Sequence, residues 1–128
     1  MGLFGLGKPK RDAQVNWLNK VDLAYQHAFQ VKNAAGLEQY LTRKCLMSMV
    51  ERIRLGEKVY SGIARYQHTE WIKGEVKPDS IVYIKFVKYD NIQMSHGITV
   101  PVGDSCKERW VIVNDNGTNK ISDIRKVQ

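Results

Sequence analysis

Apolar side chains recur every three or four residues through most of the first half of the chain, which is the period of an amphipathic helix. One such stripe, running to about Lys32, consists of Val15, Leu18, Val21, Tyr25, Ala28 and Phe29. After a break at residues 33–36, a short helical piece is expected at residues 37–41. Thr42 can cap a further helix that ends near Gly56. The first half of the chain therefore predicts three helices in succession.

In the second half the apolar pattern changes to a period of two, which is typical of β-strands. The strongest alternation places one set of side chains on a single side: Ile81, Tyr83, Lys85 and Val87. Turns are expected at Gly74, at residues 77–80 and at Asn116 with Gly117. The expected strands cover residues 63–72, 81–92, 98–100, 108–113 and 121–124. Helices followed by strands predict an α+β fold, with three N-terminal helices packed on an antiparallel sheet of four to six strands.

The length and composition fit one domain. The chain has 128 residues, of which 43% are hydrophobic and 26% charged, as in ordinary globular domains. We expect a flexible basic tail at residues 1–12, which are rich in Gly and lack periodicity, and a single domain at residues 13–128. No stretch approaches the roughly 18 apolar residues of a membrane-spanning helix. Cys45 and Cys106 show no Cys-x-x-Cys spacing and fit a reducing compartment, so a cytoplasmic location is expected.

The charge of the chain is positive and uneven. The formal net charge is +7 and the sequence pI is about 9.5. The first 60 residues carry +5 of this charge, and residues 61–128 carry +2. A basic half favours an anionic partner, such as lipid head groups or an acidic protein face, although charge also serves solubility alone.

Apolar and basic side chains occur together at the N-terminus and again in the helix expected after Thr42. Large apolar side chains followed by cations can insert at an anionic interface, where each Lys or Arg contributes about 1 kcal/mol. This predicts weak, reversible docking at the periphery of a membrane or on a protein partner, the alternative being a tail without function. The candidate contact residues are Leu3, Phe4, Lys8, Lys10, Arg11, Arg43, Lys44, Arg52 and Arg54.

Three segments together resemble the nuclear-transport-factor-2-like superfamily. They are the first helix with Ala24, Tyr25 and Ala28, the small turn and Leu-x-x-Tyr-Leu-Thr segment at residues 35–42, and the paired strands at residues 108–113 and 120–124. The pattern is most similar to the domain of the mitochondrial import-motor scaffold (the Tim-forty-four type) and its bacterial relatives. The resemblance implies a cone of helices on a curved sheet around a pocket. It also implies a non-enzymatic binding module that can form a homodimer through the sheet face.

Enzymes of this superfamily use Asp, His or Tyr inside the cone, which leaves open an alternative function. The chain would then be a small pocket enzyme of the isomerase, dehydratase or cyclase type, acting on an apolar enolisable molecule. Such chemistry needs a base near a carbon-bound proton and a donor to the enolate. The candidate catalytic residues are Asp22, Tyr25, Asp90 and His96.

Other classes of site have little support in the sequence. His27, His68 and His96 show no metal-ligand spacing, so we expect no metal. Glycines at the N-terminus follow no strand and make no nucleotide fingerprint, so we expect no cofactor. Basic and aromatic residues interleave between residues 60 and 89, as in single-strand nucleic-acid binders. Half-covered antiparallel strands have the same composition, so we do not expect a nucleic-acid partner.

Overall fold

The computed structural model describes residues 13–57, 67–89, 92–93, 99–100 and 105–127. Its elements are α1 (Ala13–Val31), the 3-10 helix η1 (Ala35–Leu37), α2 (Arg43–Arg54), β1 (Gln67–Lys77), β2 (Ser80–Tyr89), β3 (Ile92–Gln93), β4 (Thr99–Val100), β5 (Ser105–Asp115) and β6 (Thr118–Val127). The helices precede the strands, and the fold is α+β as predicted.

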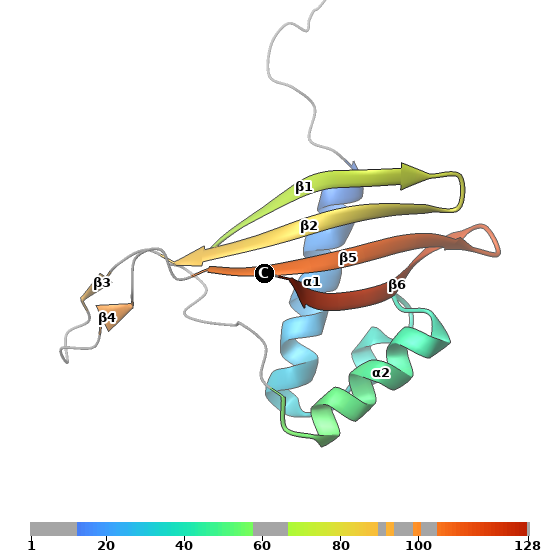
Figure 1. The fold of residues 1–128 in the computed structure, drawn as a ribbon. Helices are drawn as coiled ribbons and strands as arrows, with labels where there is room; N and C mark the ends of the chain where they lie inside the picture. The colour runs from blue at the N-terminus through green and yellow to red at the C-terminus, as the bar shows by residue number, and fades with distance from the viewer. Residues whose placement is uncertain (1–12, 58–66, 90–91, 94–98, 101–104, 128) are drawn as a thin grey trace, which may run out of the picture.

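The main sheet has four antiparallel strands in the order β1-β2-β5-β6, as Figure 1 shows. The two short strands β3 and β4 pair with each other in a separate two-stranded sheet. The main sheet therefore has the lower number of strands in the predicted range of four to six.

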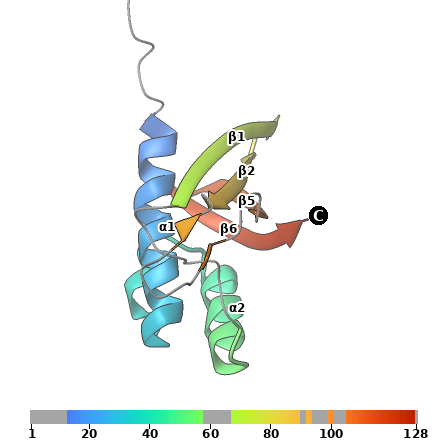
Figure 2. The ribbon, with the colours of Figure 1, turned by 90° about the vertical axis from the view of Figure 1, so that its left-hand side faces the viewer.

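Helix α1 crosses one face of the main sheet, and α2 lies beside the edge strand β6 (Figures 1 and 2). The core between these layers is aromatic at its centre. The Tyr25 ring on α1 lies 5.2 Å from the Phe29 ring and 5.4 Å from the Trp110 ring on β5, in edge-to-face geometry. The Trp110 ring lies 5.0 Å from the Trp71 ring on β1. These rings bury large apolar areas and fix the distance between α1 and the sheet.

The boundaries of α2 follow from its capping residues. The Thr42 hydroxyl accepts a hydrogen bond from the backbone N–H of Cys45 at 3.3 Å, which satisfies one of the free donors of the first turn. Gly56 has a φ of +78°, the left-handed conformation that ends many helices. Both predicted ends of this helix are confirmed.

The structure does not confirm the short second helix that was expected at residues 37–41. Only a 3-10 turn forms in this part of the described chain, at Ala35–Leu37, and Leu41 makes a parallel bridge with Ile121 on β6. The backbone N–H of Ile121 donates to Tyr40 O at 2.8 Å, and the N–H of Thr42 donates to Ile121 O at 2.9 Å. These bonds hold the chain extended, so pairing with the sheet overrides the local helical pattern.

The turn expected at Gly74 is also wrong, because β1 continues to Lys77. A register shift between Lys73 and Val76 absorbs the glycine as an irregularity in the ladder with β2. The chain reverses at Pro78 and Asp79 instead, within the predicted turn at residues 77–80. The second predicted hairpin turn is confirmed, with φ of +53° at Asn116 and +86° at Gly117.

None of the helices that the structure describes is both long enough and apolar enough to cross a bilayer.

Candidate functional site

A cluster of charged side chains lies between α1 and the sheet. Lys85 Nζ on β2 lies 2.5 Å from Asp22 Oδ1 on α1 and 3.1 Å from Glu108 Oε1 on β5. The three side chains are between 1% and 6% exposed. One buried cation thus bridges two buried carboxylates from different layers of the domain, and each ion depends on the others for its compensation.

Tyr25 connects this cluster to the surface. Its hydroxyl donates to Glu108 Oε2 at 2.8 Å and accepts from an Arg52 NH2 group at 3.2 Å. The Trp110 indole N–H also donates to Glu108, at 3.2 Å. Arg52 in turn forms an ion pair with Glu57, which is partly exposed. A continuous chain of polar contacts therefore runs from the middle of the core to the end of α2.

Local sequence spacing and strand register assemble the cluster. Asp22 and Tyr25 are three residues apart on α1, so they share one helical face. Lys85 and Glu108 are direct cross-strand partners of β2 and β5, so their side chains leave the sheet on the same face. That face is turned toward α1.

Burial dominates the titration of two of these groups. It raises the pKa of the Asp22 carboxyl, and the charge and hydrogen bond of Lys85 oppose the rise. Burial also raises the pKa of Tyr25, and the negative charge of Glu108 raises it further. The Tyr25 hydroxyl is therefore a stable proton donor to Glu108 at physiological pH.

The cluster is saturated by its own contacts. Within the described part of the chain, every buried side-chain nitrogen and oxygen has a hydrogen-bond partner. None of its four members, Asp22, Tyr25, Lys85 and Glu108, lines the three grooves described among these residues. The described residues also contain no group of three or more His, Cys, Asp or Glu placed to hold a metal ion. The cluster therefore joins the helical layer to the sheet.

The structure brings together two of the four candidate catalytic residues. Asp22 and Tyr25 are joined through Lys85 and Glu108, while Asp90 and His96 lie outside the described residues. The convergence of all four on one cavity, which the enzyme hypothesis requires, stays a prediction.

The basic residues predicted on the third helix separate into two groups. Arg43, Lys44 and Arg54 are exposed on α2. Arg52 points inward, where it donates to Tyr25 and to the backbone carbonyl of Ile124 at 3.2 Å, and its side chain is 16% exposed. The predicted contacts in the tail, Leu3, Phe4, Lys8, Lys10 and Arg11, lie outside the described residues.

Two large apolar side chains accompany these cations on the surface of α2. Met47 is 63% exposed and Val50 is 51% exposed. Together with Arg43 and Arg54 they follow the spacing i, i+4, i+7 and i+11, which places all four on one helical face. A groove of about 420 Å³ runs beside them, between α2 and the end of α1, and its lining includes Leu46, Val50 and Ile53.

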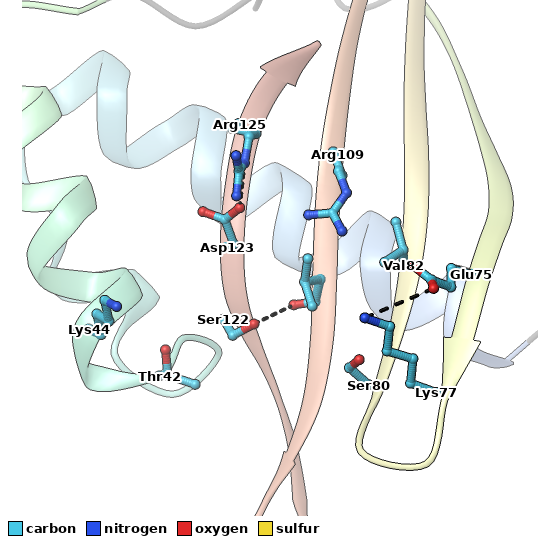
Figure 3. A pocket seen from close by; sticks show the side chains of 11 residues that line it. Thr42, Lys44, Glu75, Lys77, Ser80, Val82, Arg109, Ser122, Asp123 and Arg125 are labelled. Atoms are coloured by element: carbon cyan, nitrogen blue, oxygen red, sulfur yellow. Dashed lines mark hydrogen bonds and ion pairs between the residues drawn. The ribbon is translucent and has the colours of Figure 1, made fainter.

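A second, more polar groove lies on the face of the sheet that is turned away from α1. It has a volume of about 490 Å³, and Figure 3 shows its side chains on the strands and at the start of α2. The lining residues are Thr42, Lys44, Glu75, Lys77, Ser80, Val82, Arg109, Val111, Ser122, Asp123 and Arg125. The groove carries both charged and hydroxyl groups.

The sequence contains signals for the residues of the buried cluster that were not singled out. Lys85 occurs in an alternation of otherwise apolar side chains, and Glu108 stands two residues before Trp110 on the same side of its strand. A charge at a position that should be buried indicates a paired partner. Which residue is the partner of the buried charge depends on the register between strands, and the pattern of a single strand does not give that register.

No family model matches the chain, and no curated protein matches it. Among solved structures the chain is similar to Aln2 from a Streptomyces species, with a TM-score of 0.51 and 8% identity over 94% of each chain. It is also similar to the association domain of C. elegans CaMKII, with a TM-score of 0.49 and 12% identity, covering 91% of this chain and 96% of that one. A third similar structure is the designed protein Rd1NTF2_04, with a TM-score of 0.44 and 18% identity, covering 85% of this chain and 98% of that one.

The similarity to Aln2 shows a shared nuclear-transport-factor-2-like fold and carries no information on activity. The predicted resemblance is thereby confirmed at the level of the fold. The closer relationship to the import-motor scaffold domain stays a prediction.

Proposed function

We propose that the protein is a non-enzymatic binding module that docks reversibly on an anionic lipid surface through the outer face of α2. The observation that carries this proposal is the single helical face formed by Arg43, Met47, Val50 and Arg54, in which two exposed apolar side chains lie between two cations. An amphipathic helix with this composition binds at the boundary between head groups and acyl chains.

The expected strength of docking follows from the side chains of this face. Each cation near an anionic surface contributes about 1 kcal/mol, and partial burial of Met47 and Val50 adds a similar amount each. The tail at residues 1–12, with its three large apolar and three basic side chains, adds to this total in the proposal. The sum corresponds to weak attachment that salt weakens further.

Co-sedimentation with liposomes tests the proposal. The full chain should bind vesicles of phosphatidylserine and phosphatidylcholine more strongly than vesicles of phosphatidylcholine alone, and salt should reduce binding. Arg54 forms an ion pair with Glu51, so the double substitution Arg43→Gln and Arg54→Gln should weaken binding by roughly fivefold to thirtyfold, which corresponds to about 1–2 kcal/mol. A matched control, Lys73→Gln with Lys126→Gln, removes two exposed cations from the strands and should leave binding within about twofold.

Two further variants separate the contributions. Replacing Met47 and Val50 by Ser should have its largest effect on binding at high salt. Salt screens the cations there, so the apolar side chains supply most of the remaining binding free energy. Removal of residues 1–11 should reduce binding of the full chain if the tail takes part. Equal binding by the α2 variant and its control would contradict the proposal, as would the absence of binding to anionic vesicles. An acidic protein surface would then become the leading partner.

No specific observation favours the alternative function, a pocket enzyme. Asp22 and Tyr25 are buried in a saturated cluster, and the comparisons with solved structures favour neither an enzyme nor a binding module. A homodimer through the sheet face likewise stays a hypothesis, and light scattering over a range of protein concentrations tests it directly.

A further inference from the structure

Two arginines stand opposite each other on the outer face of the main sheet. Arg109 on β5 and Arg125 on β6 are direct cross-strand partners. Direct partners project from the same face, with Cβ atoms about 5 Å apart, and like charges at such positions are unfavourable. This pair therefore needs negative charge close by.

Within the described part of the chain, one of the two arginines has that charge. Arg125 Nε donates to Asp123 Oδ2 at 2.7 Å, within its own strand. Arg109 is half-buried, and among the residues that the structure describes it has no ion-pair partner. Its neighbour on the other side, Ile84 of β2, offers no acceptor in its side chain. The described residues thus leave one guanidinium group without a counter-ion in the middle of the sheet face.

The surrounding groove has an excess of positive charge. Its lining contains four cations, Lys44, Lys77, Arg109 and Arg125, and two carboxylates, Glu75 and Asp123. Lys77 Nζ lies 3.9 Å from Glu75, so both carboxylates are already committed to a cation. The groove therefore carries a net charge of +2, and Figure 3 shows Arg109 and Arg125 above the hydroxyl of Ser122 on neighbouring strands.

We propose that this groove binds the phosphate group of a phosphomonoester, held between the guanidinium groups of Arg109 and Arg125. The planar fork of arginine matches the oxygens of phosphate, and two forks on adjacent strands can each donate two hydrogen bonds. The excess charge of the groove equals the charge of a phosphomonoester dianion, whereas a single carboxylate would leave one cation uncompensated. The site is distinct from the α2 face of the proposed function and does not depend on it.

The phosphate can come from a small phosphorylated molecule or from a phosphorylated side chain of another protein. The two sources share the same recognition chemistry, and they differ in what lies beyond the phosphate. The groove of about 490 Å³ extends along the sheet toward Ser80 and Thr42, so it has room for either.

Isothermal titration with inorganic phosphate tests the site in the full chain. Phosphate should bind more tightly at about pH 7.5 than at about pH 5, because the dianion forms only as the pH rises through the second pKa of phosphate. Sulfate should bind with little dependence on pH over the same range. Arg109→Gln should weaken phosphate binding at least tenfold, and the matched variant Lys126→Gln, on the same sheet but outside the groove, should change it less than twofold.

A second measurement distinguishes a binding role from a structural one. In the absence of ligand, Arg109→Gln should be at least as stable as the native chain, because it relieves the like-charge pair. Added phosphate should raise the melting temperature of the native chain and of Lys126→Gln but not that of Arg109→Gln. A melting temperature that falls in Arg109→Gln without ligand, together with unchanged phosphate affinity, would overturn the proposal.

The source of the phosphate is tested by comparing O-phosphoserine with a nine-residue peptide that carries phosphoserine at its centre. Tighter binding of the peptide, lost without the phosphate, supports a phosphorylated protein segment. Equal affinity for the two supports a small molecule. Failure of phosphate and sulfate alike to bind, or an equal loss in Arg109→Gln and Lys126→Gln, would show that the groove is no phosphate site.

Discussion

Lys85 in strand β2 forms a buried ion pair with Asp22 in helix α1, 63 residues earlier in the chain. The pair links the helical layer to the sheet at the centre of the domain, and Glu108 completes it from β5. Removing charges from water is costly, so such a pair specifies the position of its partners more than it adds stability. The cost of breaking it is nevertheless large, because the remaining ions lose their compensation.

Replacing Lys85 by Met should destabilise the domain by about 3–5 kcal/mol, because Asp22 and Glu108 are left buried without a cation. Urea unfolding at neutral pH measures the loss. The exposed Lys20 on α1 provides the control, since Lys20→Met should change the free energy of unfolding by less than about 0.5 kcal/mol. A triple variant that also carries Asp22→Asn and Glu108→Gln should recover part of the loss.

The free energy of unfolding of Lys85→Met should depend on pH. Burial already raises the pKa of Asp22 in the native chain, and loss of Lys85 removes the group that opposes this rise. A raised folded-state pKa gives stability that is present below the unfolded value and is lost as pH rises through the folded value. The deficit of Lys85→Met relative to the native chain should therefore be smaller at about pH 4 than at about pH 7.5. A deficit independent of pH would contradict the ionised state assigned to the cluster.

Tyr25→Phe should destabilise the domain by about 1–3 kcal/mol. The substitution removes the hydroxyl that donates to Glu108 at 2.8 Å and accepts from Arg52, so both partners lose a hydrogen bond in a buried setting. Thermal unfolding of Tyr25→Phe and Tyr40→Phe makes a matched comparison. Tyr40 is only partly buried and packs edge-to-face on Trp17, so its loss of a hydroxyl should cost less than about 0.5 kcal/mol.

The thiol of Cys45 should resist alkylation in the folded domain. Burial, together with the negative charge of Asp123, raises its pKa to about 12, and the side chain is 2% exposed. Because the thiolate is the reactive form, iodoacetamide should modify Cys45 slowly at pH 8 and rapidly once urea unfolds the chain. Peptide mapping by mass spectrometry assigns the modified cysteine. Rapid modification under native conditions would mean that α2 leaves the sheet readily.

Gly117→Ala should cost about 1 kcal/mol although no atom stands within 4 Å of the added methyl group. The reason is its φ of +86°, which an alanine adopts only with strain. Gly36→Ala is the control, because that site is equally open and its φ lies outside the strained range. Chemical denaturation of both variants should show a loss at Gly117 alone. Equal losses would mean that the turn tolerates another conformation.

The sequence pattern was sufficient for the order and class of the elements, because periods of 3.6 and 2 follow from burying one face of each element. It failed at residues 37–41, where a bridge between Leu41 and Ile121 holds the backbone extended. That bridge joins positions 80 residues apart and leaves no trace in local spacing. Local rules therefore predict an element correctly only where no distant strand competes for its hydrogen bonds.

The same limit explains which parts of the candidate sites were predicted. Helical spacing grouped Asp22 with Tyr25, and alternation placed Lys85 on the same side of its strand as Tyr83 and Val87. The pairs that define the chemistry, Lys85 with Glu108 and Arg109 with Arg125, depend on the register between strands. Register is set jointly by turns, irregularities and packing, so these partners become visible only in three dimensions.

Strand β6 has a consequence for the order in which the domain can assemble during synthesis. Its backbone supplies the acceptors that hold Thr42 and Arg52, and its Ile121 forms the bridge to Leu41. Helix α2 is synthesised before β6. It therefore cannot dock on this strand until residues 118–127 have left the ribosome. A nascent chain stalled before that point should carry α2 undocked, with its apolar face open to chaperones, and docking should follow in one late step.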